Sequence, residues 1–460
     1  MASAGVTRAV FPNADAPVRL AGDWFGRFER KGPVVVAVSG GSDSTAALVA
    51  LHRALPPAGG RPGFSLLACT VDHGLRAESA EEAAAVGRLC RTLGIVHVIR
   101  RWDGAKPASG LQAAAREARY RLLADVAKSA GAVAIVTGHT REDQAETIAM
   151  RAARMPGQAV GLAGMAEAVL LHRRFWLLRP FLACRREELR FFLRHEGIGW
   201  FDDPANRNIG YERVRWRARA VDEGIVAGTA TQQALRRGMA AEAAERIARH
   251  VRVHENLVAE VAPPLVAEMA AGPAARRAVF TLSAVLGGRR HPPSSDTMTR
   301  LLAVLSSGEP GRVTAGRTVF DRRRDALYLY REARDLPGQP DGEGLWDGRF
   351  RLPASPGGES LRPACDPAPF AGRLVASGVP QGVARRAAVA APEVVCASGE
   401  AVSLLRQLAP ATPSAAMIEP VIAPYDTFLP CFDLTMADEI ARLFRLPPYP
   451  RSPLGGENVL

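Results

Sequence analysis

The sequence has few cysteines, no long hydrophobic run and no sign of a leader segment. Its six cysteines lie at positions 69, 90, 184, 365, 396 and 431 and form no C-x-x-C pair. Zinc ribbons and secreted disulfide scaffolds need dense or paired cysteines, so both are disfavoured. No stretch approaches the roughly 20 apolar residues of a membrane span, and acidic residues interrupt the N-terminus where a signal peptide would be apolar. We therefore expect a reduced, cytoplasmic protein with no membrane partner.

The charge of the chain is strongly one-sided. Its 59 Lys and Arg residues outnumber 47 Asp and Glu residues, which gives a net charge of +12 over 460 residues. Such a surplus favours a polyanionic partner, and nucleic acid before a membrane surface, although a generally basic proteome would also produce it. The hydrophobic fraction of 47% is ordinary for a globular protein and excludes wholesale disorder.

Short apolar runs alternate with long helix-forming segments in the first 150 residues. The runs lie at 34–38, 65–71, 96–99 and 133–137, and the helical segments at about 44–54, 78–93, 110–129 and 142–154. Each run is apolar on both faces, which is typical of buried parallel strands. The order predicts an α/β fold with a doubly wound parallel sheet, whose ligands bind beyond the carboxyl ends of the strands.

The remaining sequence changes character twice. Residues 173–219 are rich in arginine, residues 221–306 are rich in alanine and suggest helices, and 318–330 suggest a hairpin. Residues 337–369 are rich in Gly and Pro, as in a linker. We predict a catalytic domain at 1–220, a mainly helical domain that binds nucleic acid at 221–335, and a poorly characterised C-terminal region of unknown role at 336–460.

A glycine-serine loop directly follows the first predicted strand. It reads Ser39, Gly40, Gly41, Ser42, Asp43 and Ser44, and a helix begins there. Glycines let a phosphate approach the backbone, and a helix N-terminus supplies N–H donors. The lysine of a Walker loop is missing, so the loop suits a pyrophosphate leaving group. Asp43 would repel phosphates unless Mg²⁺ bridges them or the side chain only caps the helix; a plain turn with a helix cap is the alternative for the whole loop.

This hexapeptide resembles the S-G-G-x-D-S fingerprint of the PP-loop ATP pyrophosphatase superfamily. The resemblance implies cleavage of ATP to AMP and pyrophosphate, adenylation of a substrate oxygen, and an adenine-nucleotide α-hydrolase version of the doubly wound fold.

Four further segments carry ionisable residues at the predicted binding edge or beyond it. They are Thr70–Arg76 with Asp72 and His73, Gln112–Tyr120 with Arg116 and Arg119, Thr137–Thr147 with His139, Asp143 and Glu146, and Trp200–Arg213 with Asn206, Arg207 and Arg213. Each has an ordinary structural alternative. Asp72 could be a turn residue, His139 a histidine at a strand end, and the two arginines of 112–120 part of a solvated helix face.

In this order the segments resemble the tRNA(Ile)-lysidine synthetase family over about residues 30–217. The resemblance implies that ATP adenylates C2 of the wobble cytidine in the CAU anticodon of tRNA(Ile). Free L-lysine then displaces AMP to give lysidine, which pairs with A instead of G. The chain departs from the family pattern at 140–142 and 154–157, and the resemblance is weak beyond about residue 335.

The resemblance also implies roles for individual residues. The loop 39–44 holds pyrophosphate, with Asp43 acting through Mg²⁺, and the backbone near Val71 contacts adenine. His139 and Arg116 steady charge at the α-phosphate or activated base. Asp143 and Glu146 share a helix face and bind the lysine ammonium and accept its proton, unless they are only acidic residues at a helix start. The tRNA contacts are assigned to Asp72, His73, Arg119, Asn206, Arg207 and Arg213; a homodimer is one assembly that the sequence leaves open.

Three rival functions remain at this point. A tRNA cytidine thiolase normally carries cysteine pairs for an iron–sulfur cluster, which this chain lacks. A small-molecule amidating synthetase would not need the basic surplus. A nucleotide-binding protein without catalysis would not need the intact hexapeptide.

Overall fold

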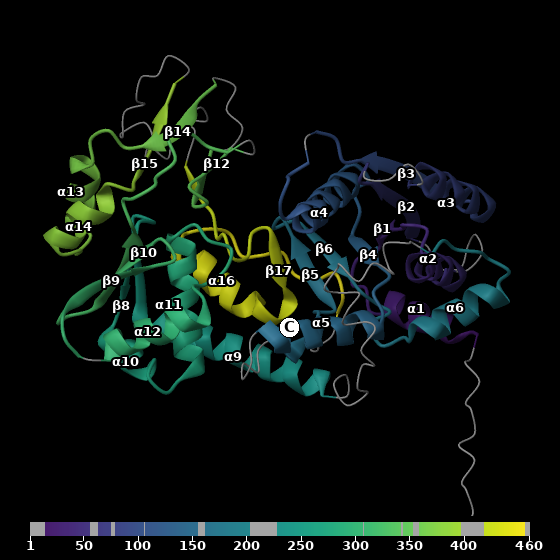
Figure 1. Cartoon of the computed structure of the whole chain (residues 1–460), viewed down its shortest axis with the longest axis horizontal. Coiled ribbons are helices and arrows are strands. Elements are labelled where there is room, and N and C mark those ends of the chain that lie inside the picture. The colour runs from purple at the N-terminus through teal and green to yellow at the C-terminus, as the bar shows by residue number, and fades with distance from the viewer. Residues whose placement is uncertain are drawn as a thin grey trace, which may run out of the picture. The chain divides into compact units, whose positions relative to one another are not determined.

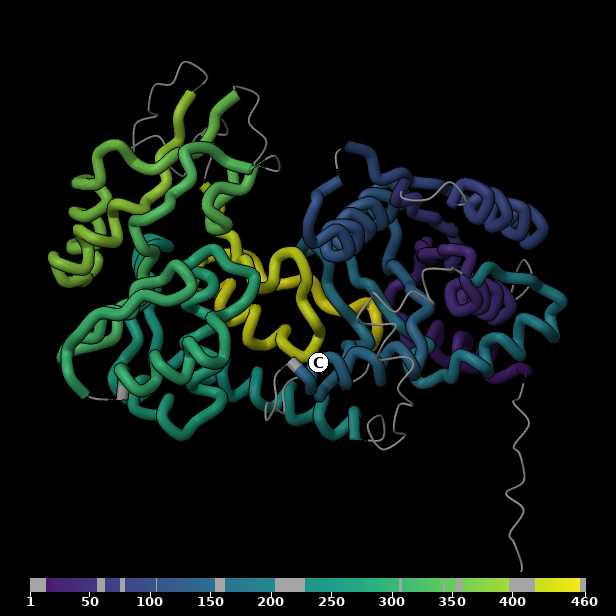
Figure 2. The backbone as a smooth tube through the Cα atoms, in the orientation of Figure 1, coloured from purple at the N-terminus to yellow at the C-terminus, as the bar shows by residue number. Residues whose placement is uncertain are grey.

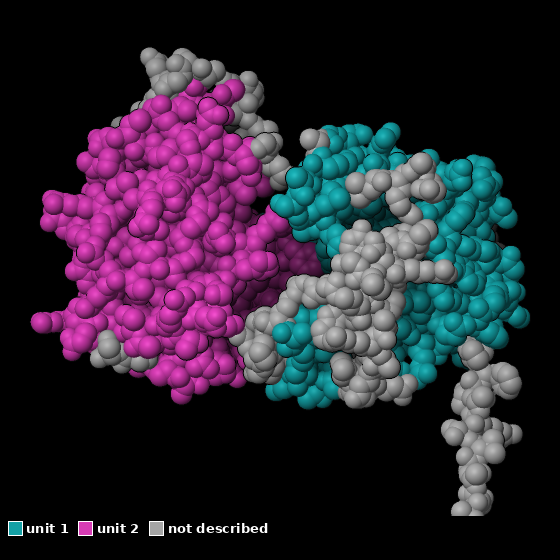
Figure 3. Space-filling model, viewed as in Figure 1, with its two compact units in different colours: residues 1–235, 451–460 teal, residues 236–450 magenta. Residues whose placement is uncertain are grey.

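The computed structural model describes residues 14–55, 63–74, 79–104, 106–154, 162–202, 228–306, 308–341, 344–352, 358–396 and 418–455, which are coloured in Figure 2. The chain forms two compact units, one of residues 1–235 with 451–460 and one of residues 236–450 (Figure 3). The division falls inside a helix rather than at the predicted boundaries after 220 and 335. In the described part, no helix is long and apolar enough to cross a membrane.

The first unit contains the predicted alternation of strands and helices (Figure 1). Its elements are α1 (Ala16–Gly26), β1 (Gly32–Ala37), α2 (Ser42–Ala54), β2 (Phe64–Asp72), α3 (Ser79–Leu93), β3 (Val96–Arg101), α4 (Leu111–Ser129), β4 (Ala134–Thr137), α5 (Arg141–Arg154), β5 (Ala168–Leu171), β6 (Phe175–Leu178) and α6 (Arg186–His195). The helix α9 (Thr229–His250) begins in this unit. The predicted doubly wound α/β fold is confirmed.

The strand order in this unit is β5-β6-β4-β1-β2-β3. β1 pairs in parallel with β2 on one side and with β4 on the other. The chain therefore changes direction across the sheet at β1, and such a switch point is where doubly wound sheets bind ligands. β5 runs antiparallel to β6, so the sheet is mixed rather than purely parallel.

One strand differs from the expectation of burial on both faces. β3 lies at the edge of the sheet and is largely exposed, with Val96 65% and Ile99 48% accessible. The apolar run 96–99 was predicted to be a buried strand, and this part of the prediction is wrong. β3 pairs only with β2 in the described sheet, so no neighbouring strand covers its other side.

The second unit combines helices with small sheets. It contains the rest of α9, then β7 (Val251–His254), β8 (Val258–Val261), α10 (Pro263–Glu268), α11 (Pro273–Leu286), α12 (Ser295–Ser306), β9 (Gly311–Ala315), β10 (Thr318–Arg322), β11 (Leu327–Arg331), β12 (Leu345–Trp346), β13 (Phe350–Arg351), β14 (Ser360–Pro363), α13 (Ala368–Ala376), α14 (Gln381–Ala388), β15 (Pro392–Val395), β16 (Glu419–Pro420), β17 (Phe428–Pro430), a 3-10 turn (Cys431–Asp433) and α16 (Leu434–Leu443). The predicted hairpin is β10–β11, in a five-stranded antiparallel sheet ordered β7-β8-β11-β10-β9. The strands β7 and β8 interrupt the stretch 221–306 that was expected to be helical.

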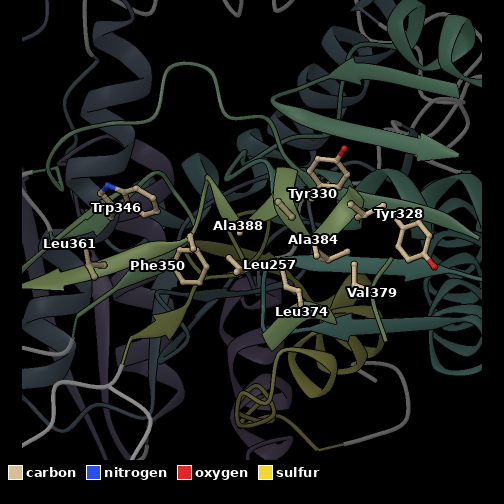
Figure 4. Close-up of a cluster of buried hydrophobic side chains, with 14 of the residues drawn as sticks. Leu257, Tyr328, Tyr330, Trp346, Phe350, Leu361, Leu374, Val379, Ala384 and Ala388 are labelled. Carbon is tan, nitrogen blue, oxygen red and sulfur yellow. The ribbon is translucent and has the colours of Figure 1, made fainter. Parts of the chain in front are cut away.

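The core of the second unit runs across residue 335. Tyr328 and Tyr330 of β11 pack in one buried cluster with Trp346, Phe350 and Leu374 from the Gly/Pro-rich region and beyond (Figure 4). Each of these side chains is no more than 3% exposed. Residues on both sides of the predicted boundary thus share one hydrophobic core.

Candidate active site

Hydrogen bonds of its own serines hold the loop after β1 in shape. The Ser39 N–H donates to Ser44 Oγ at 3.1 Å, and Ser44 Oγ donates to the Gly41 carbonyl at the same distance. Gly40 has a φ of +86°, which a residue with a side chain rarely adopts. The result is a tight turn that ends at the N-terminus of α2, with hydroxyls and backbone N–H groups at the switch point of the sheet.

A distant segment also contacts this loop. The Phe201 N–H donates to the Gly40 carbonyl at 2.9 Å, and Gly41 forms a parallel bridge with Phe201. The motif that begins at Trp200 therefore contacts the glycine-serine loop through its backbone. Its predicted tRNA-contacting residues, Asn206, Arg207 and Arg213, lie outside the described residues.

Gly138 brings the end of β4 against the same loop. A Cβ placed on Gly138 would lie 2.5 Å from the Asp43 carbonyl oxygen and 2.9 Å from Ser44 Cα. Real side chains do not approach backbone this closely, so only glycine fits here. This close contact sets the segment from His139 onward beside the first turn of α2.

Asp43 lies in an ion pair that the sequence did not predict. Arg186 Nε lies 2.8 Å from Asp43 Oδ2, while Ser42 Oγ donates to Asp43 Oδ1 at 2.9 Å. Burial raises the pKa of Asp43 above its ordinary value, although the positive charge of Arg186 opposes the shift. Burial would lower the pKa of Arg186, but the charges of Asp43 and Asp143 outweigh it and raise that pKa.

Asp143 lies at the start of α5 and is buried, with 6% of the residue exposed. Its Oδ2 accepts the Thr140 N–H at 2.9 Å and the Thr140 hydroxyl at 3.1 Å, while its Oδ1 faces Arg186 Nη2 at 3.4 Å. One oxygen of Asp143 thus accepts hydrogen bonds at the start of α5, as a helix-capping side chain does. Glu146, one turn along α5, is 1% exposed and also acts electrostatically on Arg186.

His139 is placed among arginines at the end of β4. Its Nδ1 lies 2.9 Å from the Thr137 hydroxyl. Burial, and then the charges of Arg179, Arg119 and Arg116, hold the pKa of His139 well below its ordinary value, against the charge of Asp143. Burial and these charges therefore favour the neutral form of the imidazole. The charges of Arg119 and Arg116 on α4 therefore act on this histidine, although Arg116 itself is exposed.

The end of β2 carries Val71, Asp72 and His73. Asp72 Oδ1 accepts the Gly74 N–H and the Ser79 hydroxyl, both at 2.8 Å. Burial would raise the pKa of Asp72, but these two hydrogen bonds outweigh it and lower the pKa. Asp72 thus does act as a turn residue. Burial, then Arg119, lowers the pKa of His73, which connects β2 electrostatically with α4.

Three arginines at the site were missed as individual residues. Arg186 and Arg190 belong to the arginine-rich stretch 173–219, from which the sequence analysis singled out neither of them, yet Arg190 Nε lies 3.4 Å from Ser42 Oγ. Arg179 is 1% exposed, and its Nη1 donates to the Ala166 carbonyl at 2.6 Å. The spacing of 186 and 190 by four residues puts both on one face of α6, but it does not indicate that this face meets the start of α2.

The loop of residues 39–44 offers a cation one carboxylate, that of Asp43. Among the described residues, no group of three or more His, Cys, Asp or Glu side chains could hold a metal. Asp43 with Ser42 fits Mg²⁺ in the way that phosphate-bound Mg²⁺ is held, through one or two carboxylates and the oxygens of the phosphates. Asp43 is the residue that would hold it.

The site as a whole joins the glycine-serine loop after β1 to the buried carboxylates of Asp143 and Glu146, which follow the neighbouring strand β4. A family model described as the PP-loop domain matches residues 20–223, which is the part of the chain that builds this site. The fold and the site define an ATP-using PP-loop enzyme.

Comparison with curated proteins identifies the family. The chain is 48% identical to "tRNA(Ile)-lysidine synthase" of Rhizobium meliloti (strain 1021), over 92% of this chain and 93% of the relative. It is 41% identical to the protein of that name from Mesorhizobium japonicum, over 92% and 95%, and 42% identical to that of Brucella ovis, over 69% and 73%. The chain belongs to the tRNA(Ile)-lysidine synthase family, and its membership sets aside the thiolase and amidating-synthetase alternatives.

Proposed function

We propose that this enzyme joins free L-lysine to C2 of the wobble cytidine in the CAU anticodon of tRNA(Ile), at the cost of ATP. The C2 oxygen attacks the α-phosphorus of ATP, pyrophosphate leaves, and the lysine ε-amine then displaces AMP from C2. The observation that carries this proposal is the Asp43–Arg186–Asp143 cluster, because it connects a pyrophosphate cradle with carboxylates suited to an ammonium.

The phosphate end of the site is built for a leaving group. We assign pyrophosphate binding to residues 39–44, with Arg186 and Arg190 of α6 supplying positive charge. Mg²⁺ held by Asp43 would neutralise charge on the phosphates. The backbone at Val71 remains our assignment for adenine, by its place at the end of β2.

The carboxylate end is suited to the amine. Free lysine has a side-chain pKa of about 10.4 and arrives as an ammonium that must lose a proton before it attacks. Asp143 and Glu146 are buried on one face of α5, where screening by water is weak. We assign ammonium binding to both and proton transfer to one of them.

The arginine-lined side of the site is suited to the adenylated base. Neutral His139, together with Arg116, would hold the α-phosphate and the activated cytidine. Asp72, His73 and Arg119 would lie toward the anticodon loop, as would Asn206, Arg207 and Arg213. Residues 221–335 stay our prediction for further tRNA binding, and a cytoplasmic location and a homodimer also stay predictions.

Incubation with radiolabelled lysine, ATP and separated tRNA species tests this function. We expect label in the CAU-anticodon tRNA(Ile), with one AMP and one pyrophosphate released per lysine. Label in methionine tRNA, which has the same anticodon, would contradict the assigned specificity. Release of ADP and orthophosphate would contradict the chemistry.

A further inference from the structure

The Arg186 guanidinium connects two sites that the proposed reaction must fill in turn. It reaches Asp43 on the phosphate loop and, with a second nitrogen, the Thr140 hydroxyl and Asp143 Oδ1 at the start of α5, both at 3.4 Å. Its side chain is 16% exposed, so these interactions are only partly screened. The Arg186 side chain thus connects the loop after β1 with the loop after β4.

The two halves of this bridge differ in strength. The contact with Asp43 is a 2.8 Å ion pair, whereas the contact with Asp143 measures 3.4 Å. The Arg186 backbone is held separately, because its N–H donates to Glu142 Oε2 at 2.9 Å. The side chain can therefore change partners while the start of α6 stays in place.

The contact with Asp143 involves the oxygen that an ammonium would use. Oδ2 accepts both donors of Thr140, and Oδ1 is the oxygen that faces Arg186. A lysine ammonium at Oδ1 would lie against a guanidinium of the same charge. Arg186 in this position disfavours lysine binding.

We propose that Arg186 couples nucleotide binding to lysine binding, an inference that rests on the proposed function. Without nucleotide, Arg186 pairs with both carboxylates and keeps lysine affinity low. When phosphates occupy the loop, Arg186 turns to them and leaves Asp143 Oδ1 to the ammonium. The enzyme then takes up lysine after ATP, and a bound lysine is not held in a site without an activated base.

Equilibrium binding of radiolabelled L-lysine to the full chain tests the coupling. It is measured with and without saturating α,β-methylene-ATP and Mg²⁺, an analogue that cannot release pyrophosphate. For the wild type we expect nucleotide to raise lysine affinity at least about fivefold, the lower end of ordinary coupling between sites. By linkage, lysine must raise the affinity for the analogue by the same factor.

Two substitutions at Arg186 separate coupling from folding. Arg186→Gln is expected to raise lysine affinity in the nucleotide-free enzyme and to shrink the effect of nucleotide to less than about twofold. Arg186→Lys keeps a charge for the phosphates, but its compact ammonium cannot span both carboxylates, so coupling should fall there as well. Arg194→Gln is the matched control, since Arg194 lies on α6 and pairs with Glu187 at the surface.

The outcomes distinguish the two proposals. If the wild type binds no lysine even with nucleotide, the proposed lysine site is wrong. If it binds lysine equally well with and without nucleotide, the two sites are not coupled and the inference is wrong. If both Arg186 variants keep the full effect of nucleotide, the coupling does not depend on Arg186 and the inference is equally wrong.

Discussion

Arg186 and Asp43 are 143 positions apart in the chain, yet Arg186 Nε lies 2.8 Å from Asp43 Oδ2. Two segments that looked unrelated, a phosphate loop and an arginine-rich helix, thus meet at one carboxylate. The contact joins the site that we assign to the nucleotide with the site that we assign to lysine.

Asp43→Asn should lower tRNA-dependent exchange of pyrophosphate into ATP by about 100-fold or more, because a lost charge-stabilising group costs several kcal/mol in the transition state. The asparagine keeps the size of the side chain but carries no charge for Mg²⁺. The exposed Asp125→Asn on α4 is the control for loss of a carboxylate. Normal exchange in the Asp43 variant would refute the metal assignment.

Asp143→Asn should abolish transfer of lysine while pyrophosphate exchange continues. The amide keeps an oxygen for the Thr140 N–H, so the loss of stability should stay near about 1 kcal/mol, as for a helix cap. Thr140→Val is the matched control, since it removes one donor to Asp143 and leaves the carboxylate. If Thr140→Val stops lysine transfer equally, Asp143 serves the helix rather than the substrate.

Gly138→Ala should destabilise the protein by about 1–3 kcal/mol and weaken nucleotide binding, since an overpacked contact forces the backbone to move. The new methyl would meet the Asp43 carbonyl carbon at 2.8 Å, within the first turn of α2. Gly22→Ala is the control, because nothing lies within 4 Å of its Cβ position on α1. Thermal unfolding and titration with the ATP analogue measure both effects.

Acid should destabilise the fold in part through His139. Its folded-state pKa lies well below the ordinary value, so below about pH 6.5 the unfolded chain binds a proton that the folded chain does not. The free energy of unfolding therefore rises with pH through this window, by up to about 1.4 kcal/mol per pH unit for one group, and the contribution of His139 is fully present above it.

His139→Gln should flatten the dependence of urea unfolding on pH between 5 and 6.5. The exposed His195→Gln is the control for loss of an imidazole, and an unchanged slope in the His139 variant would show that its burial does not cause the effect.

Binding of tRNA should weaken steeply with salt. The net charge of +12 implies that phosphate contacts supply much of the affinity. For six or more such contacts, affinity falls by about 10³-fold or more between 50 and 200 mM salt. Filter binding across this range measures the slope, and a flat response would contradict a surface that follows phosphates.

The sequence predicted most of the first unit and little of the second. Buried strands such as 34–38 and the helices between them have strong local patterns, and the structure places them as expected. The edge position of Val96 and Ile99 was missed because pairing partners are not encoded locally. β7 and β8 were missed because alanine-rich surroundings favour helix until tertiary pairing overrides that preference.

By itself, the sequence determined the phosphate loop, its position between strand and helix, and the motifs that resemble the family, because these are contiguous and follow from local chemistry. Only the tertiary structure decided which arginines serve the site. Arg186 and Arg190 look like the surface of any basic helix until α6 lies across the start of α2. Gly138 likewise looks like an ordinary glycine until the fold brings the Asp43 backbone within 3 Å of its Cβ position. Contacts between distant segments depend on how the whole sheet is packed, and no local pattern encodes them.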